Sequence, residues 1–293
     1  MADPTTAVAV VLASAGRPGL LAEAMASCRT QVDISFTGVV SVPDERSLPT
    51  CRAVLDGWQV VVGSRGLAAQ RNAGMDALGD DVDVVAFFDD DAVLREDYLA
   101  RAVAFLGDHP DVQGLTGRVL LDGATTGEVS SVDAATALAG SDRLAARWRH
   151  TRELYGCNFV VRLAAARRLR FDERLPLYSW LEDHDFARRL MTVGPLVEVE
   201  GCVMVHRAAA SGGRQAHGRL GYSQVMNPIY LARKGSFPVW LATQQIFRPV
   251  AKNIALAAAG PSASWRRERL RGNALAVRDA VCGRITPERI VDL

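Results

Sequence analysis

The chain has 293 residues, of which 49% are hydrophobic and 23% charged, so it can bury a large core as one domain or as a domain with an appendage. Its formal net charge of +1 excludes a uniformly basic or acidic protein. The charge is nevertheless uneven, because residues 219–293 contain 12 Lys or Arg and 4 Asp or Glu, a net charge of +8. The first 218 residues contain 22 basic and 29 acidic side chains, a net charge of −7.

Cysteine usage and the amino-terminal sequence indicate a reduced, cytoplasmic setting. The five cysteines are odd in number and form no C-x-x-C pair, which argues against a disulfide framework and against a zinc site. The start of the chain has no basic flank followed by an apolar signal core. No apolar run reaches the length of about 18 residues that a membrane-spanning helix needs. We therefore expect a cytoplasmic protein that is soluble or bound to the inner membrane surface.

Short β-branched runs alternate with helical patterns in the first third of the chain. The expected strands are 8–12, 37–42, 60–62 and 84–88, and the expected helices are 20–29, 67–78 and 97–106. This alternation predicts an α/β fold with a mostly parallel, Rossmann-like central sheet that helices cover on both faces.

The remaining elements are predicted from weaker patterns. We expect strands at 112–121, 155–161, 196–199 and 202–205, and a long loop at 122–141, where no period is clear. Ser179-Trp180-Leu181-Glu182 has the form of a helix capping box, with apolar residues of the following helix spaced to bury one face. Beyond Gly218 the chain is predicted to be helical and basic.

Three consecutive carboxylates follow the apolar strand at 84–88. Asp89, Asp90 and Asp91 repel one another unless a cation neutralises them, and Mg²⁺ or Mn²⁺ takes oxygen ligands of this kind. The alternative is a solvated acidic turn before the helix at 97–106. Taken alone, the triplet favours neither interpretation.

Two further acidic or imidazole sites lie at element ends. Glu182-Asp183-His184-Asp185 begins a predicted helix, and His206 ends a predicted strand. Together with the triplet they indicate a metal centre beside a carboxylate base, which could neutralise a diphosphate leaving group and deprotonate an attacking hydroxyl. Each has a structural alternative, because acidic residues favour helix N-termini and a single histidine is often structural.

Four segments in order resemble motifs of the family 2 glycosyltransferases. VVLASAGRPGLLAEAMASCRTQ at 10–31 is similar to the family's opening, and GLAAQRNAGMDAL at 66–78 to its Arg-Asn-x-Gly segment. FFDDDAVLREDYL at 87–99 is similar to the D-x-D strand end, and WLEDHDFARRL at 180–190 to the Glu-Asp acceptor motif. The resemblance spans about residues 7–210. It implies a GT-A fold and inverting, metal-assisted transfer of a sugar from a nucleotide-diphosphate donor, UDP-linked by expectation, to a hydroxyl of a saccharide or polyprenyl-linked saccharide.

The resemblance also assigns roles to residues by their positions in these motifs. It implies Asp183 as the catalytic base that leads to inversion, and a divalent metal, Mg²⁺ or Mn²⁺, as the cofactor. The metal ligands that it implies are Asp89, Asp91 and His206. The donor-binding residues are Ala13, Ser14, Arg17, Asp44, Arg65, Arg71, Asn72, Asp89 and Asp90, and the acceptor-binding residues are Trp180 and Glu182.

Several of these assignments keep an alternative. The segment VVSVPDERSLP lacks the family's Asp-Asn-x-Ser form, so Asp44 is an approximate match, and Arg65 is assigned by location alone. Arg71 could instead form a surface salt bridge, and Trp180 could pack as a buried staple. The Gly-rich segment 210–219 is either a mobile flap, with Arg214, His217 and Arg219 as phosphate contacts, or a flexible linker.

The chain is expected to comprise a GT-A domain at 1–218 and a helical, basic tail at 219–293. Four tail aromatics, Phe237, Trp240, Phe247 and Trp265, are interleaved with basic residues, as expected of a segment that binds an anionic membrane surface. The alternative is a helical packing element with a solvated basic face. No nucleic-acid-binding module accompanies the basic residues, so nucleic acid is not an expected partner, and the sequence leaves the oligomeric state open.

Three alternative functions are considered. The strand and Asp triplet fit a haloacid-dehalogenase-like phosphohydrolase, but the only lysines, Lys234 and Lys252, both follow the later acidic pair and disfavour it. A sugar nucleotidyltransferase normally has a lysine after a Gly-rich loop near the N-terminus, and SAGRPGLLAEAM has none. A non-catalytic protein of GT-A fold that binds a sugar or nucleotide is the third alternative.

Overall fold

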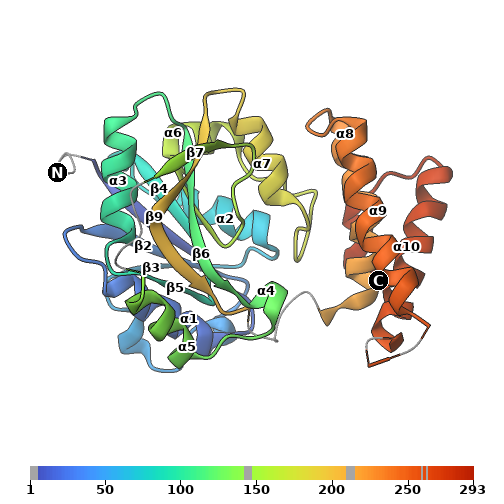
Figure 1. Ribbon diagram of the computed structural model, residues 1–293, viewed down its shortest axis with the longest axis horizontal. Helices are drawn as coiled ribbons and strands as arrows, with labels where there is room; N and C mark the ends of the chain where they lie inside the picture. Colours follow the sequence, from blue (N-terminus) through green and yellow to red (C-terminus); the bar gives the residue numbers. More distant parts are fainter. Residues whose placement is uncertain (1–5, 142–146, 209–214, 259, 262) are drawn as a thin grey trace.

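A computed structural model describes residues 6–141, 147–208, 215–258, 260–261 and 263–293. In this part of the chain, nine strands form one curled sheet that is flanked by helices (Figure 1). The strand order is β3-β2-β1-β4-β8-β6-β9-β5, and β7 also pairs with β9. The strands are β1 Val8–Ala13, β2 Phe36–Val42, β3 Trp58–Val62, β4 Val84–Asp89, β5 Ala92–Leu94, β6 Gly114–Asp122, β7 Trp148–Thr151, β8 Asn158–Arg162 and β9 Leu196–His206.

The predicted α/β fold is confirmed, with one continuous parallel block of β1 to β4 and a second parallel pair formed by β6 and β9. β1 pairs in parallel with β2 and β4, and β2 pairs in parallel with β3. Beyond β4 the sheet is mixed, because β8 is antiparallel to both β4 and β6. In a βαβ arrangement the carboxyl ends of the parallel strands lie at one edge, which is where α/β folds bind ligands.

Helices cover both faces of the sheet. Along β4, Val84, Ala86 and Phe88 belong to one buried cluster, whereas Val85 and Phe87 belong to the other. This alternation follows from the two-residue period of a strand. The first cluster includes side chains of α1 Pro18–Arg29 and α3 Tyr98–Asp108, and the second those of α2 Leu67–Asp76, α6 Leu163–Leu169 and α7 Glu182–Leu190.

The prediction of a long loop at 122–141 is wrong. The segment forms α4 Gly123–Thr126 and α5 Ser131–Ala139. Asp122 caps α4 by accepting a hydrogen bond from the Ala124 N–H, and Ser130 caps α5 in the same way through Asp133 N. The helical period was hidden because α5 is rich in alanine and buries only Ala134.

Two smaller predictions are also wrong. Helix α7 begins at Glu182, two residues later than a capping box at Ser179 predicts. Ser179 does not cap the helix, because its hydroxyl donates to Leu175 O and accepts from Ala68 N. The two short strands expected at 196–205 are one strand, β9. Its register against β6 shifts at a bulge where Gly117 pairs with Val199 and the next residue pairs with Val203.

Three C-terminal helices gather at one end of the molecule (Figure 1, orange to red). They are α8 His217–Lys234, α9 Val239–Leu256 and α10 Ala263–Val281. Short 3₁₀ segments of the described residues include Glu45–Ser47, Arg52–Leu55 and Pro287–Asp292. The helical tail is thus confirmed. Among the described residues, no helix is both long and apolar enough to span a membrane.

The C-terminal helices dock on the segment that surrounds α7. Leu175 and Leu181 pack with Leu231 and Phe237 in one buried cluster. Lys234 Nζ lies 2.6 Å from Asp172 Oδ2 and 2.8 Å from Asp185 Oδ2. Both apolar and ionic contacts therefore join the tail to the α/β body.

Candidate active site

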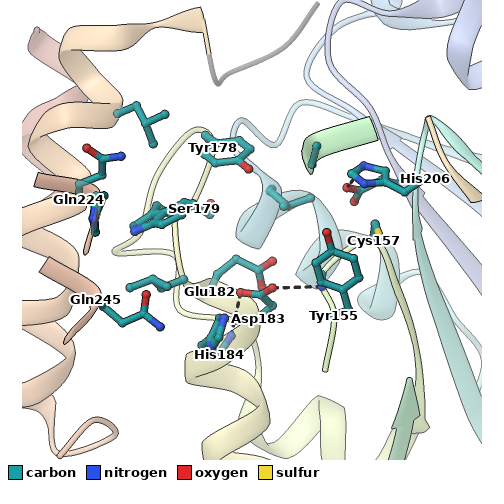
Figure 2. Close-up of a pocket in the computed structure, with 18 of the residues that line it drawn as sticks. Tyr155, Cys157, Tyr178, Ser179, Glu182, Asp183, His184, His206, Gln224 and Gln245 are labelled. Atoms are coloured by element: carbon teal, nitrogen blue, oxygen red, sulfur yellow. Dashed lines mark hydrogen bonds and ion pairs between the residues drawn. The ribbon is translucent and has the colours of Figure 1, made fainter. Parts of the chain in front are cut away.

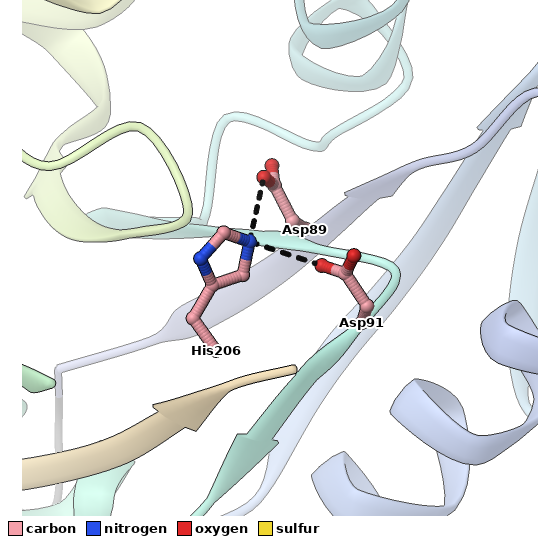
Figure 3. Close-up of side chains that lie close together, drawn as sticks. All are labelled: Asp89, Asp91 and His206. Atoms are coloured by element: carbon pink, nitrogen blue, oxygen red, sulfur yellow. Dashed lines mark ion pairs between the residues drawn. The ribbon is translucent and has the colours of Figure 1, made fainter. Parts of the chain in front are cut away.

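Asp89, Asp91 and His206 lie together at the edge of the sheet (Figure 3). Asp89 ends β4, and the register that pairs Ala92 with His206 brings the end of β9 beside the Asp triplet. His206 Nε2 is 3.4 Å from Asp91 Oδ1 and 4.0 Å from Asp89 Oδ2. One ligand atom from each residue lies within 4.8 Å of the others. Two carboxylates and an imidazole at this spacing fit a divalent metal such as Mn²⁺ or Mg²⁺.

Asp122, at the end of β6, orients His206. His206 Nδ1 lies 2.8 Å from Asp122 Oδ1, and Tyr155 Oη donates a 2.6 Å hydrogen bond to Asp122 Oδ2. Burial raises the pKa of Asp122, but hydrogen bonds from Tyr155 and His206 outweigh it, so the pKa lies below its usual value. Because an ionised carboxylate can only accept, the Nδ1 proton points to Asp122 and Nε2 faces the aspartates. Sequence reasoning missed Asp122 and Tyr155.

Without a bound cation, the negative charges around His206 favour the protonated form of its imidazole. Burial opposes the charge, but the hydrogen bond with Asp91 and the negative charges of Asp89 and Asp91 raise the pKa of His206 to about 9. Either a proton on His206 or a metal cation would therefore offset the negative charge of Asp89 and Asp91.

Asp90 is fully buried and serves to position other residues. Its carboxylate accepts hydrogen bonds from Ser14 Oγ and from Arg17 Nε, the latter at 3.0 Å, and Arg17 Nη1 also lies 3.3 Å from Asp91 Oδ2. Burial raises the pKa of Asp90 to about 7, while Arg17 acts in the opposite direction. Asp90 thus fixes Ser14 and Arg17 after β1.

Arg71 of α2 is almost completely buried, at 1% exposure, so the alternative of a surface salt bridge is wrong. Its guanidinium donates to Glu182, to Gly156 O and to Asp89 Oδ1, the last at 3.3 Å. The rings of Phe87, Phe159 and Phe171 surround it, with centroids 5.2 to 5.8 Å from Cζ. Arg71 therefore ties the metal cluster to the start of α7.

Glu182 and Asp183 sit in different environments. Glu182 is buried against Arg71, and burial raises its pKa to about 8 although Arg71 lowers it. Asp183 Oδ2 accepts a 3.1 Å hydrogen bond from Gly156 N, and Oδ1 accepts one of 2.8 Å from His184 N. Two backbone donors thus hold the Asp183 carboxylate in one orientation.

Two cavities meet at Asp89. The first, of about 570 Å³, is lined by Asp89, Asp183 and His206 of the body and by residues of α8, α9 and α10. Figure 2 shows Asp183, Tyr155 and His206 on one side of it, and Gln224 and Gln245 on the other. The second, of about 320 Å³, opens over the turn after β1 and is also bordered by Asp89. We name the first the acceptor-side cavity, after the expectation that Asp183 faces an acceptor, and the second the β1-side cavity.

The segment 177–181 forms a wall of both cavities. Leu177, Ser179 and Leu181 have φ values of 60°, 52° and 72°, a left-handed conformation that non-glycine residues rarely adopt. Leu177 O accepts a 2.9 Å hydrogen bond from Leu67 N, which ties the segment to the start of α2. Tyr178 lines both cavities, and Trp180 lines the acceptor side.

Trp180 lies both at a cavity and beside an apolar cluster. Its side chain lines the acceptor-side cavity and also packs against the apolar cluster of Leu175, Leu181 and the C-terminal helices. Its carbonyl accepts a 2.8 Å hydrogen bond from Asn227 Nδ2.

The predicted donor residues divide into two groups. Ala13, Ser14, Arg17, Arg65 and Asp89 line the β1-side cavity, whereas Asp44, Arg71, Asn72 and Asp90 line neither cavity. Asp44 instead accepts a hydrogen bond from Ser47 Oγ, which in turn accepts one from Gly16 N. The Asn72 amide bonds to the backbone of Phe171 and to Glu173, so it joins α2 to the segment after α6.

The Gly-rich segment is described only in part. Arg214 lies outside the described residues. His217 stacks on Trp265 with a ring separation of 5.0 Å, and Arg219 lines the β1-side cavity. Of the tail aromatics, Trp240 and Phe247 are exposed, whereas Phe237 is buried against the body.

Comparison with known proteins agrees with this site. Residues 84–216, which contain the Asp triplet, Asp183 and His206, match the family model described as glycosyl transferase family group 2. No curated protein sequence matches the chain.

Solved structures share the fold. The structure of the mannosyltransferase PcManGT from Pyrobaculum calidifontis, in complex with GDP-Man and Mn²⁺, is similar with a TM-score of 0.61 and 17% identity, over 95% of this chain and 90% of that one. TarS from S. aureus is similar with a TM-score of 0.54 and 14% identity, over 95% of this chain, which spans 50% of TarS. Residues 84–216 thus match glycosyl transferase family group 2, and the fold of the chain is similar to that of GT-A glycosyltransferases.

Proposed function

We propose that this protein is an inverting, metal-dependent glycosyltransferase that moves a sugar from a nucleotide-diphosphate donor to a hydroxyl of a saccharide or lipid-linked saccharide. The observation that supports this most is the position of Asp89, which borders both cavities and belongs to the cluster with Asp91 and His206. The donor would occupy the β1-side cavity and the acceptor the larger one, so that the reacting groups meet at Asp89.

Asp183 is the proposed base. It lies in the acceptor-side cavity, and its carboxylate is oriented by Gly156 N and His184 N. It would take the proton of the acceptor hydroxyl while that oxygen attacks the anomeric carbon from the side opposite the nucleotide. One displacement from that side forms the new C–O bond, breaks the bond to the diphosphate and inverts the anomeric centre.

Asp89, Asp91 and His206 would hold the cation, Mn²⁺ or Mg²⁺. Bound there, it would supply positive charge to the departing diphosphate. Arg71 assists by holding Asp89, and Asp122 by fixing the His206 tautomer. Ser14, Arg17 and Arg65 would contact the nucleotide-diphosphate from the other side of Asp89.

The identity of the donor is tested by titrating the protein with four nucleotide sugars, with and without Mn²⁺: UDP-glucose, UDP-galactose, UDP-N-acetylglucosamine and GDP-mannose. GDP-mannose is included because PcManGT was solved with it. We expect one nucleotide class to bind in a metal-dependent way and to hydrolyse slowly without acceptor. A nucleotidyltransferase would instead form a nucleotide sugar from a nucleoside triphosphate and a sugar phosphate, and a binding protein would show no turnover with any acceptor.

We also propose that α9 places the enzyme on the cytoplasmic membrane surface. Trp240, Phe247 and Ile254 are spaced by seven residues and are 61 to 69% exposed, so they form one apolar stripe, and Arg248 is exposed beside it. A polyprenyl-linked acceptor would reach the site from that surface.

Sedimentation with phosphatidylserine vesicles tests this placement. The double variant Trp240→Ser, Phe247→Ser should lose vesicle binding, whereas Val132→Ser, at an exposed apolar position on α5, should keep it. Equal sedimentation of the double variant and the unchanged protein would contradict the membrane proposal.

A further inference from the structure

The C-terminal helices supply a basic wall to the acceptor-side cavity. Lys252 of α9 and Arg266 and Arg269 of α10 line the same cavity as Asp183. None of the three belongs to the metal cluster or to the predicted donor residues. We call these three residues the basic wall.

Arg266 is the central member, because its charge is buried and pairs with no acid among the residues that the structure describes. The residue is 8% exposed, and its Nη1 donates a 2.7 Å hydrogen bond to the neutral Asn253 Oδ1. Within the described part of the chain it forms no ion pair, and its buried Nε has no hydrogen-bond partner. A buried guanidinium without a counter-charge is costly, and an anion in the cavity would offset that cost.

A polar network among the three C-terminal helices fixes the position of Arg266. Asn253 of α9 is fully buried, and its Nδ2 donates to Gln224 Oε1 on α8 at 3.0 Å and to Asn273 Oδ1 on α10 at 3.2 Å. Asn273 in turn donates a 2.6 Å hydrogen bond to Gly221 O. Because each helix contributes to the network, the guanidinium is positioned before any ligand binds.

Trp265 brings the second arginine close to the first. Arg266 Cζ lies 4.0 Å and Arg269 Cζ 4.5 Å from the centroid of the Trp265 ring, and His217 stacks on the same ring. Both guanidinium groups therefore border the cavity beside one aromatic ring.

We propose that the basic wall binds an anionic group of the acceptor, a phosphate or a carboxylate, while Asp183 faces the hydroxyl that reacts. This inference rests on the proposed function, because it requires the larger cavity to hold the acceptor. The donor's diphosphate has other cations at hand, since Arg17, Arg65 and Arg219 line the β1-side cavity. The acceptor is therefore a charged saccharide or a saccharide attached through a phosphate.

Calorimetric titration with three small probes tests the proposal: methyl phosphate, glucuronate and the uncharged methyl glucoside. We expect an anionic probe to bind better than methyl glucoside, and Arg266→Gln to weaken that binding by about tenfold or more. Preference for methyl phosphate would indicate a phosphate-linked acceptor, and preference for glucuronate an acidic sugar. Arg271→Gln is the matched control, because Arg271 is exposed on the same helix and lines neither cavity.

Because Arg266 is buried, Lys252→Gln provides a second variant at an exposed position of the same wall, and thermal unfolding verifies that each variant is folded. Lys252→Gln should also weaken binding of the anion. Equal binding of charged and uncharged probes, or anion binding that neither substitution weakens, would overturn the proposal.

Donor hydrolysis by the unchanged protein separates the two hypotheses. If Arg266-dependent anion binding occurs but no nucleotide sugar binds or hydrolyses, the proposed function fails and the anion site stands. If a nucleotide sugar hydrolyses but no anion binds, the anion site fails and the proposed function stands.

Discussion

The backbone N–H of Gly156 donates a 3.1 Å hydrogen bond to Asp183 Oδ2, and a Cβ added at Gly156 would lie only 2.8 Å from that oxygen. The glycine therefore allows the carboxylate and the turn before β8 to approach closely. Gly156→Ala should displace Asp183 and lower kcat by about tenfold to a hundredfold, with donor binding retained. Acceptor-dependent turnover and donor titration measure the two effects.

Gly107→Ala is the matched control for this substitution, since a Cβ there meets nothing within 4 Å. It should leave kcat unchanged. Unchanged kcat in Gly156→Ala would show that the orientation of Asp183 is not critical.

Asp183→Asn should abolish most transfer. The amide cannot take the acceptor's proton. Because both Asp183 oxygens accept from backbone N–H groups, the NH₂ group of Asn would also face a donor, either Gly156 N or His184 N. We expect kcat to fall by on the order of 10² or more, with metal-dependent donor binding near that of the unchanged protein. Single-turnover assays with saturating donor measure the step directly, and retained transfer would refute Asp183 as the base.

Asp122→Ala should weaken Mn²⁺ binding by about 10-fold to 100-fold, because His206 loses the carboxylate that fixes its tautomer. The measurement is a Mn²⁺ titration monitored through donor binding. Tyr155→Phe, which removes only the phenol's hydrogen bond to Asp122, should have a smaller effect. Equal affinities in Asp122→Ala and the unchanged protein would argue against His206 as a ligand.

Acid should weaken the docking of the C-terminal helices. Burial acts to raise the pKa of Asp172, but hydrogen bonds from Lys234 and Tyr230 outweigh it and hold the pKa below its usual value. A lowered folded-state pKa gives stability that is present above the unfolded-state pKa of about 3.9 and is lost as the pH falls through the folded value. Urea unfolding should therefore show Asp172→Asn less stable at pH 7, with the difference shrinking below about pH 4. A difference that does not change with pH would rule out this ionic contribution.

The sequence alone was sufficient to predict the elements that consist of continuous runs of apolar or β-branched residues. β1, β2 and β4 are dominated by β-branched and apolar residues, and they form the predicted parallel strands. Local pattern failed for α5, where alanines hide the period, and for Ser179, whose hydroxyl is used by distant backbone groups. At Ser179 tertiary contacts decide the local structure, whereas α5 carries a local cap at Ser130 and only its helical period is hidden.

In the candidate site, too, some residues could be predicted from local sequence and others depend on contacts between distant segments. Asp89 and Asp91 could be predicted because they follow a buried strand directly. Asp122 could not, because its contact with His206 depends on the register between β6 and β9 and on the bulge within it. Arg71 lay in a recognisable motif, but its complete burial among three phenylalanines follows only from the packing of α2 on the sheet.

The three left-handed residues of segment 177–181 have a consequence for how this protein could diverge. Each such conformation costs on the order of 1 to 2 kcal/mol for a residue with a side chain, so glycine at Leu177, Ser179 or Leu181 would relieve backbone strain. Glycine would also remove side chains from the wall that this segment contributes to both cavities. At this wall, higher thermal stability and ligand discrimination therefore oppose each other, and a laboratory evolution experiment should find mutations there that improve one at the expense of the other.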